Sequence, residues 1–187
     1  MNEHLNPVFE SVLPALTEAG ICYWVYGGVA IAGIKGVYLR PNPDVDVFVV
    51  NDDYDEAREL VAGLEKDLSW DHQDTLQRER RKREWHVTGN RHDIFSLVPV
   101  FRDGDQIRFV FKRDFIPNTV LTSVTRKIGN HRFTTPSTEF IKELLICKVN
   151  SGNLSRERRK KLKVDAKVIM NDDEYRRLSD RLDKTAT

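Results

Sequence analysis

The stretch that decides the fold is residues 21–50, ICYWVYGGVAIAGIKGVYLRPNPDVDVFVV. It begins with a short apolar and aromatic run, 21–26, which predicts a buried strand. The pair Gly27-Gly28 follows at once, and 29–35 predicts a short helix. The stretch ends in a second apolar run, 45–50, which predicts another strand. A strand, a glycine turn, a helix and a second strand in this order indicate an α/β arrangement built around this segment.

The glycine pair opens the predicted helix. Glycines let a backbone approach a ligand closely, and the free N–H groups at a helix N-terminus bind phosphate. The Gly-Lys-Ser/Thr of a P-loop does not follow Gly28, so a P-loop is excluded. An ordinary tight turn between a strand and a helix has the same pattern. The glycine pair alone therefore leaves both a structural and a phosphate-binding interpretation open.

A pair of acids, Asp44 and Asp46, marks the start of the second strand. Residues i and i+2 of a strand point to the same face, so the two carboxylates are expected to project together. They repel each other unless a cation lies between them, and Mg²⁺ is the oxygen-seeking ion that fits. A solvent-exposed start of a strand also tolerates two acids. Arg40 is placed to neutralise a carboxylate or to contact phosphate.

A third carboxylate, Asp93, stands at the start of another apolar run, 93–98. A third acid beside a metal-binding pair would complete the metal site and accept the proton of an attacking hydroxyl. The alternative interpretation is that Asp93 only ends a loop.

Over the whole chain, the predicted order is helix, strand, helix, strand, helix, then several strands and finally helices. The polar stretch near 69–82 is expected to be a loop or a strand edge. The sequence predicts a mixed β-sheet core flanked by helices (1–134) and a helical C-terminal part (135–187), an α/β (α+β) fold. The other expected elements are helices at 7–19, 54–66, 137–150, 155–169 and 172–182, strands at 84–88 and 106–111, and a hairpin formed by 120–128 and 132–134.

Composition excludes several classes of protein. The chain has 187 residues, and 40% of them are apolar, which is too many for a disordered chain. No apolar run reaches the roughly 18 residues of a membrane helix, and the first residues lack the basic start of a signal peptide. Two cysteines, Cys22 and Cys147, are too few for a disulfide scaffold and are expected to be buried thiols. We therefore expect a soluble, cytoplasmic protein without a membrane partner.

The formal net charge of +1 hides an asymmetry. Residues 1–60 hold three basic and ten acidic side chains, a net charge of −7, which leaves +8 for the rest. The positive charge gathers in two runs, 78–83 and 156–163. An acidic part beside basic runs suits a cation site next to a polyanion site, although two solvated faces would have the same composition.

Together, the glycine pair, the acid pair and the distant acid resemble the signature of the DNA polymerase β-like nucleotidyltransferase superfamily. The closest likeness is to its minimal members, the AbiE-type toxins and the antibiotic nucleotidyltransferases, whose signature begins much as WVYGGVA does at 24–30. Arg40 matches an Arg that is common before the acid pair, whereas Asn42-Pro43 stands where a Thr is usual.

The resemblance extends less specifically into the helical part. Lys148 is similar to a helical Lys of the AbiE-like proteins. Residues Arg159, Lys161 and Asp165 resemble their Arg-x-Lys-Asp-x-x-Asp helix, with Leu162 in place of its first Asp.

The resemblance implies an enzyme that moves an NMP from an NTP to an acceptor hydroxyl with two Mg²⁺ ions. Nucleotidyl transfer on ATP or another NTP, to an RNA or tRNA end, a protein or a small molecule such as an antibiotic, is the expected activity. It also implies a toxin–antitoxin component with an antitoxin as a candidate partner. The metal ligands and catalytic residues would be Asp44, Asp46 and Asp93, and the nucleotide contacts Gly27, Gly28, Arg40 and Lys148.

Two other interpretations stay open at this point. A nucleotidyltransferase scaffold could bind nucleotide or RNA without chemistry, and the acid pair would then be dispensable. Alternatively, the helical tail could present an apolar face to a protein partner as the main activity of a toxin–antitoxin component. Among acceptors, a small cationic antibiotic prefers an acidic pocket, whereas the basic runs favour a polyanion such as RNA.

Overall fold

The computed structural model describes residues 2–68, 71–76, 83–89, 92–109, 116–150 and 154–184. A mixed sheet forms the centre, with strands in the order β1-β2-β5-β4-β3 and with β6 and β7 continuing from β5. Strands β1 and β2 are antiparallel, whereas β2 and β5 are parallel. The strands are β1 (Tyr23–Tyr26), β2 (Val45–Val50), β3 (Asp71–Leu76), β4 (Arg83–Gly89), β5 (His92–Asp103), β6 (Gln106–Phe109) and β7 (Ile116–Pro117).

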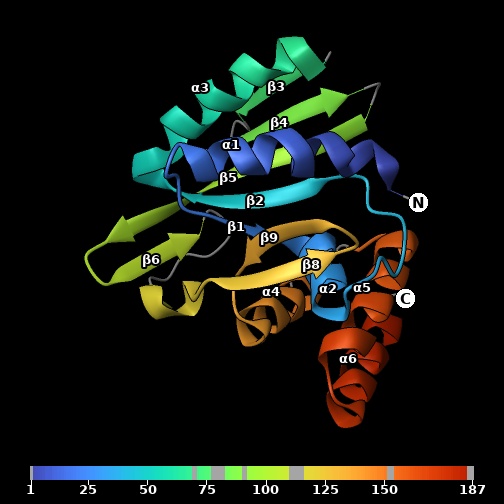
Figure 1. Ribbon diagram of the computed structural model, residues 1–187. Helices are drawn as coiled ribbons and strands as arrows, with labels where there is room; N and C mark the ends of the chain where they lie inside the picture. The colour runs from blue at the N-terminus through green and yellow to red at the C-terminus, as the bar shows by residue number, and fades with distance from the viewer. Residues whose placement is uncertain are drawn as a thin grey trace.

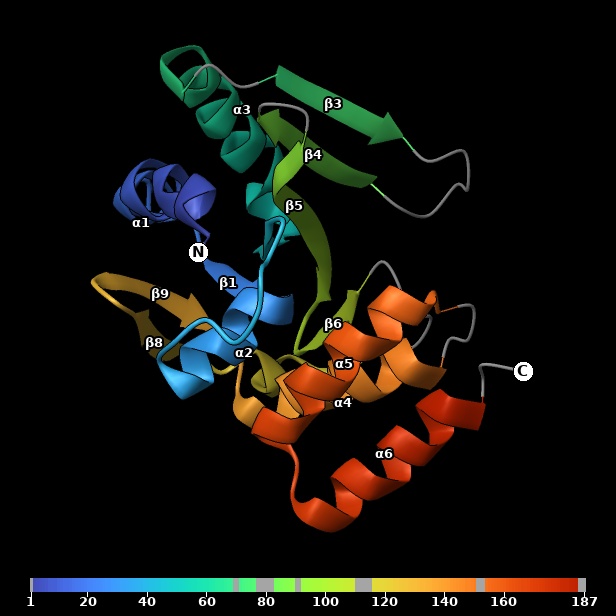
Figure 2. The same cartoon turned by 90° about the vertical axis from the view of Figure 1, so that its right-hand side faces the viewer.

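Helices cover the sheet on both sides (Figures 1 and 2). Helices α1 and α3 lie on one side, and the three C-terminal helices lie on the other. A separate hairpin, β8 (Val124–Ile128) and β9 (His131–Thr135), packs beside β1 and α2. The α-helices are α1 (Leu13–Glu18), α2 (Gly27–Lys35), α3 (Asn51–Leu68), α4 (Thr138–Asn150), α5 (Arg156–Ile169) and α6 (Asp172–Lys184).

The alternation of side chains along β2 divides the core. Val45, Val47 and Val49 are buried in the cluster shared with α1 and α3. Phe48 and Val50 belong to a second cluster on the opposite face, together with residues of α4. Asp44 and Asp46 have the same parity as Phe48, so the acid pair belongs to the face that is turned towards the C-terminal helices.

The C-terminal helices are bound to the core by their own apolar cluster. Ala30 and Ile31 of α2 pack with Ile141 of α4, Leu162 of α5 and Leu182 of α6. This packing fixes α5 opposite the glycine turn that opens α2. None of the helices within the described ranges is long and apolar enough to cross a membrane.

The structure confirms the predicted fold class and differs from the sequence prediction in detail. The predicted helix at 7–19 is a π-helical segment, η2 (Val8–Val12), that continues into α1, and a 3-10 turn, η1 (Glu3–Leu5), precedes it. The polar stretch near 69–82, expected to be a loop or a strand edge, contains β3, the last strand in the order of the sheet, whose sequence DHQDTL has no apolar alternation. A further 3-10 turn, η3 (Asn118–Leu121), precedes β8.

The expectation of buried cysteines is wrong, because Cys22 and Cys147 are both exposed. Cys22 lies directly before β1, whose residues are all buried, and is itself outside the strand. Cys147 lies on the outer side of α4, whose buried residues are Phe140, Ile141, Leu144, Leu145 and Val149.

Candidate active site

The glycine turn has a conformation and surroundings that require glycine. Tyr26 is the last residue of β1, and Gly27 begins α2 with a φ of +74°, a left-handed conformation that disfavours side chains. A Cβ on Gly27 would lie 2.6 Å from Oδ2 of Asp46, and one on Gly28 would overlap Oδ1 of Asn42 and Nη2 of Arg40. The turn therefore brings the backbone close to the Asp46 carboxylate.

Asp46 lies in the middle of this contact. It is opposite Tyr26 on β1 and opposite Ser96 on β5. Ser96, which is only 2% exposed, donates a hydrogen bond of 2.6 Å from its hydroxyl to Oδ1 of Asp46. The sequence prediction missed Ser96, because only the parallel register of β2 and β5 places it beside the acid. The bond fixes the orientation of one carboxylate and leaves Oδ2 towards the glycine turn.

Asp93 is located only through its backbone. It lies in β5 opposite Thr88 of β4, and the register shifts here, because Val87 pairs with Phe95 and leaves Ile94 as an extra residue on β5. The side chain of Asp93 lies outside the described part of the structure. Its position relative to the acid pair therefore stays a prediction.

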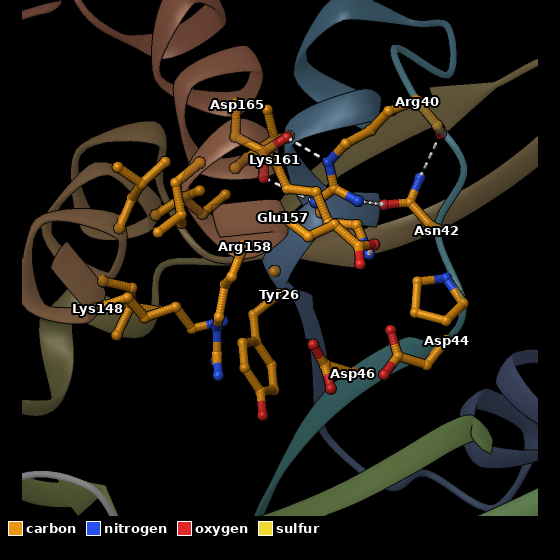
Figure 3. Close-up of a pocket in the computed structure, with 18 of the residues that line it drawn as sticks. Tyr26, Arg40, Asn42, Asp44, Asp46, Lys148, Glu157, Arg158, Lys161 and Asp165 are labelled. Carbon is orange, nitrogen blue, oxygen red and sulfur yellow. Dashed lines mark hydrogen bonds and ion pairs between the residues drawn. The ribbon is translucent and has the colours of Figure 1, made fainter. Parts of the chain in front are cut away.

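The basic groups of the site come from the C-terminal helices. Lys148 of α4 has its Nζ 5.7 Å from the ring centroid of Tyr26, a cation–π distance. The Tyr26 ring is itself stacked on Phe48, with centroids 3.7 Å apart. Figure 3 shows Lys148 and Arg158 of α5 on one side of Tyr26 and the acid pair on the other. Arg158 is a second cation that the sequence prediction did not single out.

A pocket of about 320 Å³ connects these groups. It lies between the glycine turn, the segment before β2, and helices α4 and α5. Six predicted site residues line it, namely Gly27, Gly28, Arg40, Asp44, Asp46 and Lys148. The structure thus brings together groups that lie more than 100 positions apart in the sequence. Opposed acids and bases around one cavity suit a ligand that carries both metal and phosphate.

Arg40 lines this pocket, but its guanidinium is occupied by protein groups. Nε and Nη2 donate to the two carboxylate oxygens of Asp165 at 2.9 and 2.7 Å. Nη1 donates to Oδ1 of Asn42 at 2.8 Å and to the carbonyl oxygen of Pro41 at 3.1 Å. The nucleotide contact predicted for Arg40 is untested, and the structure gives each of its three nitrogens an acceptor within the protein.

Of the two basic runs, only the second has side chains that the structure describes. The run 156–163 forms the first two turns of α5, where Ser155 caps the helix by accepting a hydrogen bond from the Arg158 N–H. Arg158 and Lys161 line the pocket, and Lys161 is paired with Glu157 at 3.0 Å. The run 78–83 lies outside the described side chains.

Asp44, directly before β2, and Asp46, within it, offer two carboxylates to a hard divalent cation. A donor set made of oxygens alone suits Mg²⁺, which also keeps waters and phosphate oxygens as ligands. Across the described side chains, no group of three acidic, His or Cys residues converges as a ready metal site. The pair fits a metal site that draws further ligands from Asp93 or from a bound substrate.

Comparison of the sequence with known proteins gives no relative. A scan against protein-family models found no match, and a search among curated proteins found none either.

Solved structures, in contrast, match the fold. The crystal structure of ANT(2'')-Ia in complex with adenylyl-2''-tobramycin has a TM-score of 0.63 at 12% identity, over 98% of this chain and 99% of that one. The lincosamide antibiotic adenylyltransferase LnuA, bound to lincomycin, gives 0.60 at 14% identity, over 90% and 98%. A nucleotidyltransferase-like protein from Paracoccidioides brasiliensis gives 0.54 at 17% identity, over 97% and 85%.

These likenesses extend over nearly the whole chain. The protein therefore has the nucleotidyltransferase fold, including the helical part after 134. At identities of 12–17%, the comparisons establish the fold, whereas the activity has to be argued from the site.

Proposed function

We propose that this chain is a metal-dependent nucleotidyltransferase that moves an NMP from an NTP to an acceptor hydroxyl. The observation that carries the proposal is the contact between the Gly27 turn and the Asp46 carboxylate, in one pocket with Asp44 and Lys148. A triphosphate that binds the N–H groups of the turn would place its phosphates beside the acid pair. The fold likeness to ANT(2'')-Ia and LnuA supports this activity.

Each residue has a role in this proposal. Asp44, Asp46 and Asp93 would hold two Mg²⁺ ions, which polarise the triphosphate and lower the pKa of the acceptor hydroxyl. Gly27 and Gly28 would bind phosphate oxygens through backbone N–H groups. Lys148 would neutralise phosphate charge from the opposite side of the pocket.

The transfer forms one bond and breaks one. The acceptor oxygen bonds to the α-phosphorus, the bond from that phosphorus to the bridging oxygen breaks, and pyrophosphate leaves. The carboxylate of Asp93 takes the acceptor's proton.

The charge of the surface beside the pocket indicates which class of acceptor is favoured. Arg156, Arg158 and Lys160 are exposed on the first turns of α5, and Arg158 itself lines the pocket. A small cationic antibiotic gains little from these charges, whereas an RNA end gains phosphate contacts. We therefore place RNA ahead of a protein or an antibiotic as acceptor, with ATP as the first NTP to test.

A toxin–antitoxin role belongs to the same proposal and is tested by co-purification with the neighbouring gene product.

The experiment is a labelling assay. Purified protein is incubated with each α-³²P-labelled NTP, Mg²⁺ and separate acceptor pools: total RNA, protein and an antibiotic panel. We expect labelled RNA, with release of unlabelled pyrophosphate. We expect a loss of at least about 100-fold in D44N and in D46N, because each change removes one acidic ligand from the reacting centre. D105N, at an exposed turn, is the matched control and should keep wild-type activity. Equal labelling by wild type and D46N would refute the proposal.

A further inference from the structure

The acid pair and the basic groups of the pocket belong to different parts of the chain. Asp44 ends the segment 36–44, which runs from α2 to β2, and Asp46 lies in β2. Arg158 and Lys161 come from α5, which is held to the core through the apolar cluster beneath α2. Any transfer chemistry in this pocket depends on the distance between these two elements, so a direct link between them has consequences for the reaction.

The Arg40–Asp165 ion pair is such a link. Arg40 is in the segment before the acids, and Asp165 is on the inner side of α5. The pair is bidentate, and the two side chains are only 15% and 7% exposed. A two-point bond between a planar guanidinium and a carboxylate fixes orientation as well as distance.

The pair is continued on the loop side by a network of amides. Asn42, which is 3% exposed, accepts a hydrogen bond from Arg40 through its side chain. Its backbone N–H donates to Oδ1 of Asn2 at 2.8 Å, and Nδ2 of Asn2 donates to the Arg40 carbonyl oxygen at 3.3 Å. Residues from the N-terminus, the acid segment and α5 thus form one connected polar group.

The Arg40 guanidinium also packs against the glycine turn. A Cβ on Gly28 would overlap Nη2 of Arg40 and Oδ1 of Asn42, so these groups lie directly against the turn. Arg40 therefore contacts three parts of the pocket at once: the turn, the acid segment and α5. Figure 3 shows the bonds to Asp165 and Asn42 above the acid pair.

We propose that Arg40 and Asp165 are positioning residues that hold the acid pair in register with the basic groups of α5. The inference rests on the proposed function. It gives Arg40 a role different from the nucleotide contact suggested by the sequence, because its three nitrogens already have acceptors within the protein. Burying an ion pair costs desolvation that its Coulombic attraction barely offsets, so its main effect is on geometry and not on net stability.

The first test does not depend on activity. Backbone hydrogen exchange across residues 38–46 is measured in wild type, R40M, D165L and the double variant. We expect exchange there to rise about tenfold in each variant, and no further in the double, because either change breaks the same link. D183N, which removes another two-point bond of α5 (to Lys163, 2.7 and 2.8 Å), should leave 38–46 unchanged. Unchanged exchange in R40M and D165L would overturn the inference.

The double variant also controls for the possibility that a single variant is too unstable to fold. A single change leaves one buried charge without its partner, whereas R40M/D165L removes both and should melt nearer to wild type than either single variant. R40K keeps the positive charge but loses the planar fork, and we expect it to behave like R40M in hydrogen exchange.

The second test separates positioning from nucleotide binding. Positioning predicts that R40M, D165L and the double variant lose kcat alike, roughly 10- to 100-fold, with a smaller change in KM for the NTP. A direct phosphate contact by Arg40 predicts a raised KM in R40M but not in D165L, and that result would overturn the inference. An inactive wild type would refute the proposed function instead, and the exchange experiment would still decide the role of the pair.

Discussion

Gly27 shows how a single residue connects the fold to the proposed chemistry. Its φ of +74° lets the chain turn from β1 into α2, and its missing side chain leaves room for Asp46. Neither requirement is visible in composition, yet both follow from a glycine pair placed directly after a strand. Ser96 and Arg40 have equally specific contacts, and both depend on partners at least 50 positions away.

Comparing a substitution at Gly27 with one at Gly20 separates the requirement for a positive φ from the requirement for space beside Asp46. G27A should destabilise the protein by about 2–3 kcal/mol and abolish nucleotide transfer, because it adds backbone strain and pushes the Asp46 carboxylate aside. G20A is the matched control, since Gly20 has a φ of +76° and a Cβ added there would meet nothing within 4 Å. It should cost only about 1 kcal/mol of strain and keep activity. Chemical unfolding and the labelling assay measure both effects, and an active G27A would contradict the proposed role of the turn.

At the scale of elements, α6 illustrates a helix attached by charge as well as by apolar packing. Asn171 and Glu174 form a reciprocal capping box, in which each side chain accepts a 3.0 Å hydrogen bond from the other's backbone N–H. Glu174 also accepts a hydrogen bond from Lys142 of α4. The Lys142 ammonium first, and then the Asn171 N–H, lower the pKa of the Glu174 carboxyl.

This lowered pKa predicts a pH dependence of stability. A carboxyl with a folded pKa below its unfolded value near 4.5 stabilises the fold above that value, and the effect disappears as the pH falls through the folded pKa. E174Q should therefore melt below wild type at pH 7, and the difference should shrink as the pH falls below about 4.5. E143Q, on the exposed side of α4, is the control. A constant difference between wild type and E174Q from pH 7 to pH 3 would contradict this assignment.

Some elements follow from sequence and others do not, for physical reasons. The strands at 21–26 and 45–50 and the helices after 137 are predictable because their apolar periodicity is local. The π-helical segment at 8–12 has the same apolar spacing as an α-helix, and β3 is polar, so neither has a distinctive signal. In the site, the acids and glycines are predictable from one short stretch. Arg158 and the Arg40–Asp165 pair depend on how α5 docks, which no local pattern encodes.

At the scale of the whole molecule, the two predicted parts share a core. Phe109 of β6 packs against Phe140 of α4 with ring centroids 5.1 Å apart, and Leu144 belongs to the same cluster. The net charge of +1 divides between an acidic first part and a basic remainder, and residues of the acidic part and of the basic helix α5 meet at the pocket. The predicted boundary at 134/135 separates the sheet part from the helical part, and it does not imply that either part folds independently.

A truncation tests this shared core. A chain of residues 1–134 loses the aromatic and aliphatic groups that cover Phe48 and Phe109, so we expect it to lack a cooperative unfolding transition. Circular dichroism during thermal unfolding, with the full chain as reference, measures the result. A cooperative transition in 1–134 would show instead that the core of this part is sufficient by itself.

The most direct measurement of the central claim is calorimetric binding of a non-hydrolysable NTP analogue to wild type and D46N, with and without Mg²⁺. We predict that the wild type binds the analogue at least about tenfold more tightly with Mg²⁺, and that D46N loses this gain because one carboxylate ligand is gone. Equal affinity with and without Mg²⁺, unchanged in D46N, would contradict a metal-dependent site and favour a non-catalytic nucleotide-binding module.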